Sequence, residues 1–284
     1  MSRTDSQNPQ PAIHHPQSEL PIGIFDSGVG GLTVFRALER RLPNESLIYL
    51  GDTARVPYGT RSVETVQRYA LEDAAFIESK KVKAIVIACN TASALAANLL
   101  REKCSVPVLG VIRPGSQQAV IKTQNRHIGL IATEATVASG AYEKAMRNLR
   151  DDIEITARAC PLFVPLAEEG WATHAVTEQV AREYLADFIA SRVDTLVLGC
   201  THYPILRHTI QKIMGDEVSL IDSGEAVAEV VAQMLEEKQL VRKSDEPRIE
   251  QFYVTDSAVR FRRVAEIFLG RNIESLETIV LGSL

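Results

Sequence analysis

The sequence predicts an α/β protein made of two pseudo-symmetric, doubly wound parallel-sheet domains, with an active site in the cleft between them. Three observations predict this fold. Short apolar runs alternate with amphipathic helical segments, which is typical of parallel sheets covered by helices. The order of these segments repeats in the two halves of the chain, which indicates a duplicated domain. In each half the third predicted strand ends in a cysteine, Cys89 or Cys200.

The predicted strands are short runs rich in Val, Ile and Leu, as expected for strands that are buried on both faces. In the first half they cover residues 22–25, 47–50, 84–88 and 106–111. In the second half they cover residues 128–132, 153–157, 195–199 and 219–221. The segments between them keep a helical spacing of apolar side chains, as at Leu32, Phe35 and Leu38. Right-handed crossovers through these helices make both sheets parallel.

The C-terminal segment has no counterpart in the repeat. It predicts a helix near 225–237, a strand near 251–254 and a helix at about 257–269. We expect this segment to pack back on the first domain, so that the chain crosses between the domains twice. The predicted domains are residues 21–113 with 226–284, and residues 114–225.

The composition is that of a globular chain, since 45% of its 284 residues are hydrophobic and 24% are charged. The formal net charge of −5 provides no basic field, which argues against nucleic acid or an anionic membrane as a partner. Residues 1–20 are rich in Ser, Gln, Pro and His and contain no apolar stretch. They are predicted to be a mobile tail rather than a signal peptide or membrane anchor, and we expect a cytoplasmic protein.

The four cysteines are too few for a disulfide framework, and free thiols are expected in a reducing compartment. The chain has no CxxC pair and no HExxH-like spacing among its six histidines, so no metal site is expected. Cys104 lies late in a predicted helix and Cys160 lies beside a proline. Both are interpreted as packing residues.

Cys89 and Cys200 are the candidate catalytic residues. Each ends a strand and precedes helix-forming sequence, where the helix dipole and unpaired backbone amides favour a thiolate that can act as a base. Either cysteine alone is better interpreted as a small buried hydrophobic residue, but their recurrence at equivalent strand ends favours chemistry. Because open parallel sheets bind ligands beyond the carboxyl ends of their strands, we expect both thiols to face one cleft.

The segment 26–31 (DSGVGG) follows a strand and opens a helix, so its glycines allow backbone amides to approach an anion. It is no dinucleotide fingerprint, because Thr33 stands where the third glycine would be. Asp26 suits pairing with a substrate ammonium group, and Ser27 suits a substrate carboxylate. Helix capping by Asp26 or Ser27 is the alternative interpretation.

Two further candidates lie near the thiols in the predicted cleft. His202 follows Cys200 by two residues and suits proton transfer, the alternative being a histidine that satisfies a loop carbonyl. Glu168 and Glu169 close a proline-punctuated loop at 161–165 that corresponds loosely to the segment 51–59 of the first half. Paired acids in a loop are usually solvated, so only the symmetry of the two loops points to the cleft.

Four segments carry a resemblance to a known family: residues 26–32 (DSGVGGL), 56–59 (VPYG), 88–93 (ACNTAS) and 198–204 (LGCTHYP). From about residue 21 to its C-terminus the chain resembles the cofactor-independent aspartate/glutamate racemases, and among them those of bacterial cell-wall synthesis. The resemblance implies an isomerase that interconverts L- and D-glutamate without pyridoxal phosphate or another cofactor. It also implies that the D-isomer enters peptidoglycan.

The resemblance extends to individual positions. The implied catalytic residues are two bases and three auxiliaries: Cys89 and Cys200, with Asp26, His202 and Glu168. The implied substrate-binding positions are Asp26, Ser27, Pro57, Tyr58, Gly59, Asn90, Thr91, Thr201 and His202. Glu169 stays the alternative to Glu168. The N-terminal extension resembles that of members activated by a nucleotide-linked cell-wall precursor, and both a monomer and a homodimer remain open.

The mechanistic hypothesis is a two-base reaction. One cysteine, as thiolate, removes the α-proton, while the other, as thiol, donates a proton to the opposite face of the intermediate. One rival is a racemase or isomerase of another small acid, such as aspartate or maleate. The other is a protein without catalytic activity that binds small anions or a partner protein.

Overall fold

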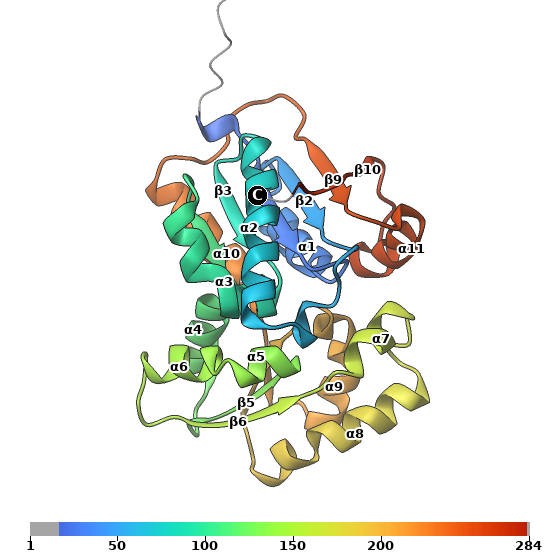
Figure 1. Ribbon diagram of the computed structural model, residues 1–284. Coiled ribbons are helices and arrows are strands. Elements are labelled where there is room, and N and C mark those ends of the chain that lie inside the picture. Colours follow the sequence, from blue (N-terminus) through green and yellow to red (C-terminus); the bar gives the residue numbers. More distant parts are fainter. Residues whose placement is uncertain (1–16, 283–284) are drawn as a thin grey trace, which may run out of the picture.

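Figure 1 shows the computed structural model, which describes residues 17–282 as two parallel sheets flanked by helices. The first sheet has the strand order β10-β9-β2-β1-β3-β4. Its strands are β1 (Ile22–Asp26), β2 (Leu47–Gly51), β3 (Ala84–Ile87), β4 (Val108–Gly110), β9 (Glu250–Val254) and β10 (Leu276–Thr278). The C-terminal strands therefore extend the first sheet beyond β2.

The second sheet repeats the strand order of the first. It runs β6-β5-β7-β8, which corresponds to β2-β1-β3-β4 of the first sheet. Its strands are β5 (His127–Ala132), β6 (Glu154–Ala159), β7 (Thr195–Gly199) and β8 (Ser219–Asp222). All strand pairs in both sheets are parallel. The predicted α/β fold with two pseudo-symmetric parallel sheets is confirmed.

Helices cover the sheets and fill the space between them (Figure 1). The α-helices are α1 (Leu32–Arg41), α2 (Val63–Ser79), α3 (Asn90–Lys103), α4 (Ile112–Lys122), α5 (Glu134–Ala138), α6 (Ala141–Arg147), α7 (Phe163–Glu168), α8 (Ala175–Ala190), α9 (Arg207–Met214), α10 (Ser223–Glu237) and α11 (Ala258–Leu269). Short 3-10 helices are η1 (Gln17–Glu19), η2 (Tyr58–Thr60) and η3 (Tyr203–Leu206). Helix α10 packs on both α1 and α4, and thereby joins the two halves.

Both faces of the central strands are buried, as a doubly wound sheet requires. In β1, Ile24 belongs to the core beneath α1 and α10, whereas its neighbour Phe25 belongs to the core beneath α2 and α3. In β7, Leu198 and Val197 are likewise divided between two cores. Burial on both faces explains why these strands are continuous apolar runs without alternation.

Three segments differ from the sequence prediction. Residues 163–168 form α7 where a loop was expected, and Pro165 is tolerated because it falls in the first helical turn, whose amides have no partner within the helix. Strand β10 was not predicted. Helix η1 lies within the segment expected to be a mobile tail, and residues 1–16 of that segment lie outside the described residues.

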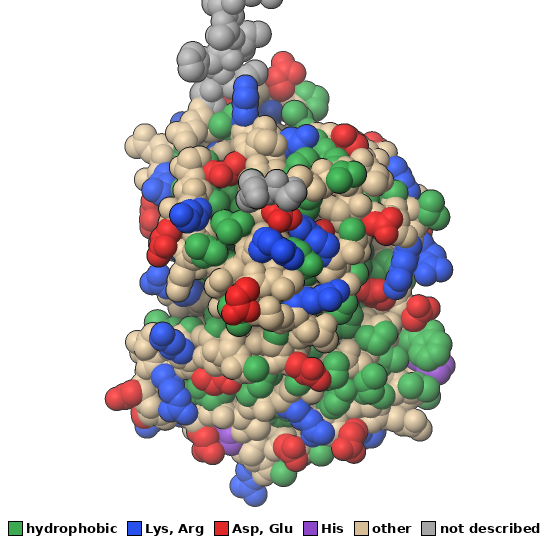
Figure 2. All heavy atoms as spheres, in the orientation of Figure 1, with side chains coloured by type: hydrophobic (Ala, Val, Ile, Leu, Met, Phe, Trp, Pro, Cys, Tyr) green, Lys and Arg blue, Asp and Glu red, His purple; other side chains and the backbone are tan. Residues whose placement is uncertain are grey.

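The surface carries both signs of charge. Acidic and basic side chains are interspersed over the face shown in Figure 2, in keeping with the small formal net charge. Exposed apolar side chains occur around α7 and α8, at Leu162, Trp171 and Val176. Across residues 17–282, no helix combines the length and the apolar content needed to cross a bilayer.

Candidate active site

The two candidate thiols lie at equivalent places in the two sheets. Cys89 follows β3 and is the N-cap of α3, where its Sγ accepts a hydrogen bond from the Ala92 amide at 3.5 Å. Cys200 follows β7, the equivalent strand of the second sheet. Both residues are buried, each with an exposed fraction of 6%. The duplication therefore places one thiol at the carboxyl edge of each sheet.

The segments that carry the thiols contact the opposite half of the molecule at one junction. Thr33, in the first turn of α1, donates a hydrogen bond from Oγ1 to the carbonyl oxygen of Thr201 at 2.9 Å. Thr91, in the first turn of α3, shares a hydrogen bond of 3.0 Å with the hydroxyl of Thr133, which follows β5. Because Thr91 lies two residues after Cys89 and Thr201 directly follows Cys200, both cysteines belong to this junction.

Asp26, at the end of β1, is a buried acid with spare hydrogen-bonding capacity. Its Oδ2 accepts a hydrogen bond from the Gly28 amide at 3.0 Å, while its Oδ1 is buried without a partner among the described residues. Burial raises the pKa of the carboxyl above its ordinary value, and the charge of His202 partly offsets that rise. A buried oxygen without a donor indicates a place for a ligand's donor.

His202 connects Cys200 to Glu168. Its Nδ1 lies 3.8 Å from the Cys200 Sγ, and its Nε2 lies 3.1 Å from Glu168 Oε1. Burial alone would lower the pKa of the imidazole, but the hydrogen bonds to Cys200 and Glu168 raise it to about 10. Glu169 is exposed. The structure therefore brings Glu168, and not Glu169, into contact with His202.

The prediction that each thiol lies at the N-terminus of a helix is correct for only one of the two cysteines. Cys89 caps α3 as predicted, whereas Cys200 is followed by a turn and by η3, so it does not begin an α-helix. Burial, followed by the charge of Asp26, raises the pKa of Cys89 to about 12 despite the hydrogen bond from Ala92. Desolvation therefore outweighs the effect of the helix N-terminus at Cys89, and this buried residue is a thiol.

Tyr58 lies in the predicted substrate-binding segment, but its hydroxyl points into the protein. The hydroxyl lies 2.5 Å from Asp52 Oδ2 and 2.8 Å from Asp73 Oδ2, and Tyr58 is 1% exposed. Burial and the charge of Asp52 raise the pKa of Asp73 well above its ordinary value. The Tyr58 side chain is therefore held by two buried carboxyl groups. The flanking residues are exposed or half-buried: Pro57 and Gly59.

Asn90 and Thr91 hold the two halves together. Asn90 accepts a hydrogen bond on Oδ1 from the Tyr142 hydroxyl at 2.7 Å, and its Nδ2 donates to Ser223 Oγ at 3.5 Å. Thr91 lies within hydrogen-bond distance of Thr133 and Thr136. Asn90 and Thr91 are each 2% exposed. Ser27, another predicted substrate-binding residue, is half-buried. Its Oγ accepts a hydrogen bond from Cys89 Sγ at 3.7 Å.

Thr133, Tyr142 and Arg260 are among the residues of the junction that the sequence prediction missed. Thr133 stands at the repeat position that matches Ser27, so the duplication carried a signal for it. Tyr142 and Arg260 lie on helices, α6 and α11. Their local sequence pattern contains no indication that they contact Asn90 and Glu168.

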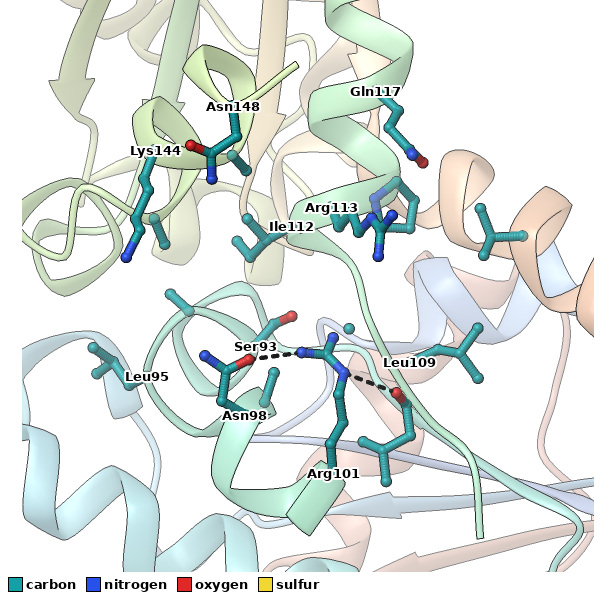
Figure 3. A pocket seen from close by; sticks show the side chains of 18 of the residues that line it. Ser93, Leu95, Asn98, Arg101, Leu109, Ile112, Arg113, Gln117, Lys144 and Asn148 are labelled. Carbon is teal, nitrogen blue, oxygen red and sulfur yellow. Dashed lines mark hydrogen bonds between the residues drawn. The ribbon is translucent and has the colours of Figure 1, made fainter.

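A cavity of about 830 Å³ lies away from the thiols, between α3, β4, α4, α6 and α10 (Figure 3). Three cationic side chains line it, namely Arg101, Arg113 and Lys144. Burial and the charge of Arg113 lower the pKa of Arg101. The candidate active site is the junction with the thiols rather than this cavity, because the cavity is lined by neither Cys89 nor Cys200 and by no carboxyl or imidazole group from the junction.

The fold and the junction define a class of protein, in which two parallel sheets of the same strand order each carry one buried cysteine after the equivalent strand. Across residues 17–282 the structure has no group of three His, Cys, Asp or Glu side chains arranged to hold a metal ion. Residues 22–231 match the family described as Asp/Glu/Hydantoin racemase. The chain belongs to this family, and it is an isomerase of the amino-acid racemase type.

Individual relatives agree with this membership. The chain is 48% identical over 260 residues to the glutamate racemase of Geobacter metallireducens, over 92% of this chain and 96% of the relative. Its fold is similar to the glutamate racemase from Francisella tularensis in complex with D-glutamate, with a TM-score of 0.88, 41% identity and coverage of 94% and 100%. It is also similar to the Escherichia coli glutamate racemase in complex with L-glutamate and the activator UDP-MurNAc-ala, with a TM-score of 0.76, 27% identity and coverage of 92% and 99%.

Proposed function

We propose that this protein interconverts L- and D-glutamate by proton transfer between two thiols and the α-carbon, and that it supplies D-glutamate for peptidoglycan synthesis. The observation that carries the proposal is the pair of buried cysteines, Cys89 and Cys200, at equivalent strand ends of one junction. Glutamate as the substrate is supported by the 48% identical relative and by the structural neighbour that holds D-glutamate. The scheme needs no pyridoxal phosphate, because the thiols perform both proton transfers.

The two thiols have different charged neighbours. A pKa of about 12 makes Cys89 a proton donor. Cys200 Sγ lies 3.8 Å from Nδ1 of His202, whose pKa of about 10 keeps the imidazole protonated at neutral pH, so that a cation faces this sulfur. Cys200 is therefore the base and Cys89 the acid for one enantiomer, and the roles are exchanged for the other.

Most of the reduction of the activation barrier must come from stabilisation of the intermediate. The α-proton of an amino acid is far less acidic than a thiol, so the enolate-like carboxylate needs preorganised donors. Ser27, Thr91, Thr201 and nearby amides are the proposed donors, each worth roughly 3 kcal/mol. The free Oδ1 of Asp26 is the proposed acceptor for the substrate ammonium group.

Substrate entry requires the junction to open, since Asp26, Cys89 and Cys200 are all buried. We propose that residues 21–113 with 226–284, and residues 114–225, are the two domains that separate and close again. Closure would exclude water and strengthen every electrostatic interaction in the site.

The test incubates the purified protein in D2O with L-glutamate as the sole substrate. Circular dichroism measures racemisation, and NMR measures deuterium at the α-carbon. We expect racemisation with deuterium at the α-carbon of the D-product. Cys89→Ser and Cys200→Ser should each abolish racemisation, yet retain exchange from one enantiomer, which differs between the two variants. Cys104→Ser is the control and should racemise normally, because Cys104 lies at the end of α3 away from the junction. Full racemisation by either of the first two variants would end the two-thiol scheme.

Another small acid as substrate is the main enzymatic rival. A panel of L-glutamate, L-aspartate and maleate, read by chiral chromatography, separates the two. Faster turnover of aspartate or maleate than of glutamate would overturn the substrate assignment and leave the two-thiol chemistry intact. Absence of turnover for every member of the panel would favour a protein that binds small anions without catalysis.

A nucleotide-linked cell-wall precursor is the proposed activator. The Escherichia coli neighbour was solved with such a compound, UDP-MurNAc-ala. In this chain the cavity shown in Figure 3 presents Arg101, Arg113 and Lys144, whose charges suit an anionic ligand. Titrating the precursor into the racemisation assay tests this; the same rate with and without it would refute activation.

A further inference from the structure

Helix α11, from the C-terminal segment without a counterpart in the repeat, packs against the Cys200 half of the site. The Phe268 ring meets the His202 ring edge to face, with 5.4 Å between centroids. Arg260, in the first turn of α11, contacts Glu168. A Cβ added at Gly170, after α7, would lie 3.3 Å from Ile267 Cδ1. In Figure 1, α11 lies next to α7 at one edge of the molecule.

These contacts form a chain that ends at one thiol. Arg260 Nη2 lies 3.0 Å from Glu168 Oε2, and Glu168 Oε1 lies 3.1 Å from His202 Nε2. His202 Nδ1 in turn lies 3.8 Å from Cys200 Sγ. Arg260 follows β9 of the first sheet, whereas Glu168 follows β6 of the second. The chain of contacts therefore crosses the junction between the two sheets.

The position of Arg260 determines how Glu168 faces His202. The terminal torsion of a glutamate is soft, so the carboxylate turns unless both oxygens are bound. Here each oxygen has its own cationic partner, His202 on one side and Arg260 on the other. Burial alone would raise the pKa of Glu168, but His202 and Arg260 together lower it below the ordinary value. Glu168 is thereby kept ionised and oriented toward the imidazole.

Cys89 has no comparable support. Among the residues that the structure describes, its sulfur contacts the Ala92 amide at 3.5 Å and the Ser27 hydroxyl at 3.7 Å. No part of α11 takes part in these contacts. The pseudo-symmetry of the two sheets is therefore broken at the site itself by the C-terminal helix.

We propose that Arg260 is a positioning residue that acts through Glu168 and His202 on Cys200, and so makes the two thiols unequal. The proposal rests on the proposed racemase function. Arg260 is 62% exposed, so its ion pair with Glu168 is screened by water and its effect is modest. Two charged groups face the Glu168 carboxylate: His202, which lies in the loop after β7, and Arg260, which lies on α11. Both lower the pKa of Glu168.

The experiment compares Arg260→Gln with Arg260→Lys, which keeps the charge, and with Arg263→Gln. Arg263 is an exposed arginine of the same helix that forms no ion pair among the described residues, so its variant has the same change in net charge. Each is combined with Cys89→Ser, which leaves Cys200 as the only site thiol, and separately with Cys200→Ser. Deuterium exchange at the α-carbon is measured from the reactive enantiomer in each background.

We expect Arg260→Gln to slow the exchange that depends on Cys200 by roughly three- to fivefold and to leave the exchange that depends on Cys89 unchanged. Arg260→Lys should restore most of the rate, and Arg263→Gln should behave as the parent. Equal loss in both backgrounds, or loss in neither, overturns the proposal. Thermal unfolding of each variant checks that the fold is intact.

A second measurement does not depend on turnover. The pKa of Glu168, followed by NMR of the carboxyl carbon and assigned with Glu168→Gln, should rise in Arg260→Gln and not in Arg263→Gln. An unchanged pKa in both variants overturns the proposal. A raised pKa in a protein that does not racemise glutamate supports the positioning of Glu168 and overturns the proposed function instead.

Discussion

Gly30 lies so close to Thr201 that a Cβ atom at Gly30 would come within 2.3 Å of the Thr201 Oγ1. The same Cβ would lie 2.5 Å from the ring of His202. Gly30 belongs to the loop between β1 and α1, and Thr201 follows Cys200 in the other sheet. The absence of a side chain at this glycine is therefore what lets the two halves of the site meet.

Gly30→Ala should separate the two halves of the site. No real Cβ tolerates such a contact, and Thr201 and His202 are buried, so the loops must shift. Displacements of about 1 Å at a catalytic site can reduce rates about a hundredfold, and we expect a loss of kcat of that order. Gly115→Ala is the matched control, because its nearest contacts are at 3.4 Å. Steady-state kinetics measure kcat for both variants. Full activity in Gly30→Ala would contradict a closed junction as the reactive state.

Glu168→Gln and Glu169→Gln form a matched pair of neighbouring substitutions. Glu168 bonds to His202, whereas Glu169 is exposed. Loss of the anion removes one of the groups that keep His202 protonated, and we expect kcat to fall about tenfold, the equivalent of one charge-assisted hydrogen bond. Glu169→Gln should keep the parent rate. Racemisation assays of both variants check this, and equal rates would count against Glu168 as an auxiliary.

Tyr58→Phe should weaken the fold more than the chemistry. The substitution removes the hydroxyl that lies between Asp52 and Asp73, so that the buried Asp73 Oδ2 loses its donor while Asp52 Oδ2 keeps the hydrogen bond from Arg55 Nε. Such a loss typically destabilises by about 1–3 kcal/mol. Tyr69→Phe is the control, since Tyr69 is half-buried and packs its ring against Tyr58. Denaturant unfolding measures the difference; a stable Tyr58→Phe protein with a much higher KM would instead place the hydroxyl on the substrate.

The stability of the protein should depend on pH through His202. The folded-state pKa is raised from 6.5 to about 10, so protonation stabilises the fold. This stabilisation is complete below 6.5 and is lost as the pH rises toward about 10. Thermal unfolding of the parent and of His202→Asn over this range should show a stability difference that narrows at high pH. A constant difference would contradict a protonated imidazole in the folded state.

Much of the site followed from local sequence. Strands such as residues 195–199 were predicted with their observed bounds, because a run buried on both faces is apolar throughout. Cys89 and Cys200 were predicted at strand ends because the repeat aligns them. The edge of a parallel sheet then brings such residues together without further information.

Other features depended on contacts between separate elements. The direction of the Tyr58 hydroxyl depends on Asp73 of α2, and the pairing of Asn90 with Tyr142 joins the two halves; neither contact has a local sequence pattern. The α7 helix was missed because Pro161 and Pro165 suggested a loop. The local sequence contained no indication that Arg260 contacts Glu168, since a charged residue on a helix usually faces solvent.

The amino-acid sequence by itself determined the duplicated α/β architecture and the two thiols, because burial periodicity and internal repetition are properties of the linear chain. Only the tertiary structure decided that Cys89 is a thiol, that Glu168 rather than Glu169 contacts His202, and that α11 adjoins one half of the site alone. The physical reason is that desolvation and charge pairing depend on distances between residues far apart in the chain, which local patterns do not encode.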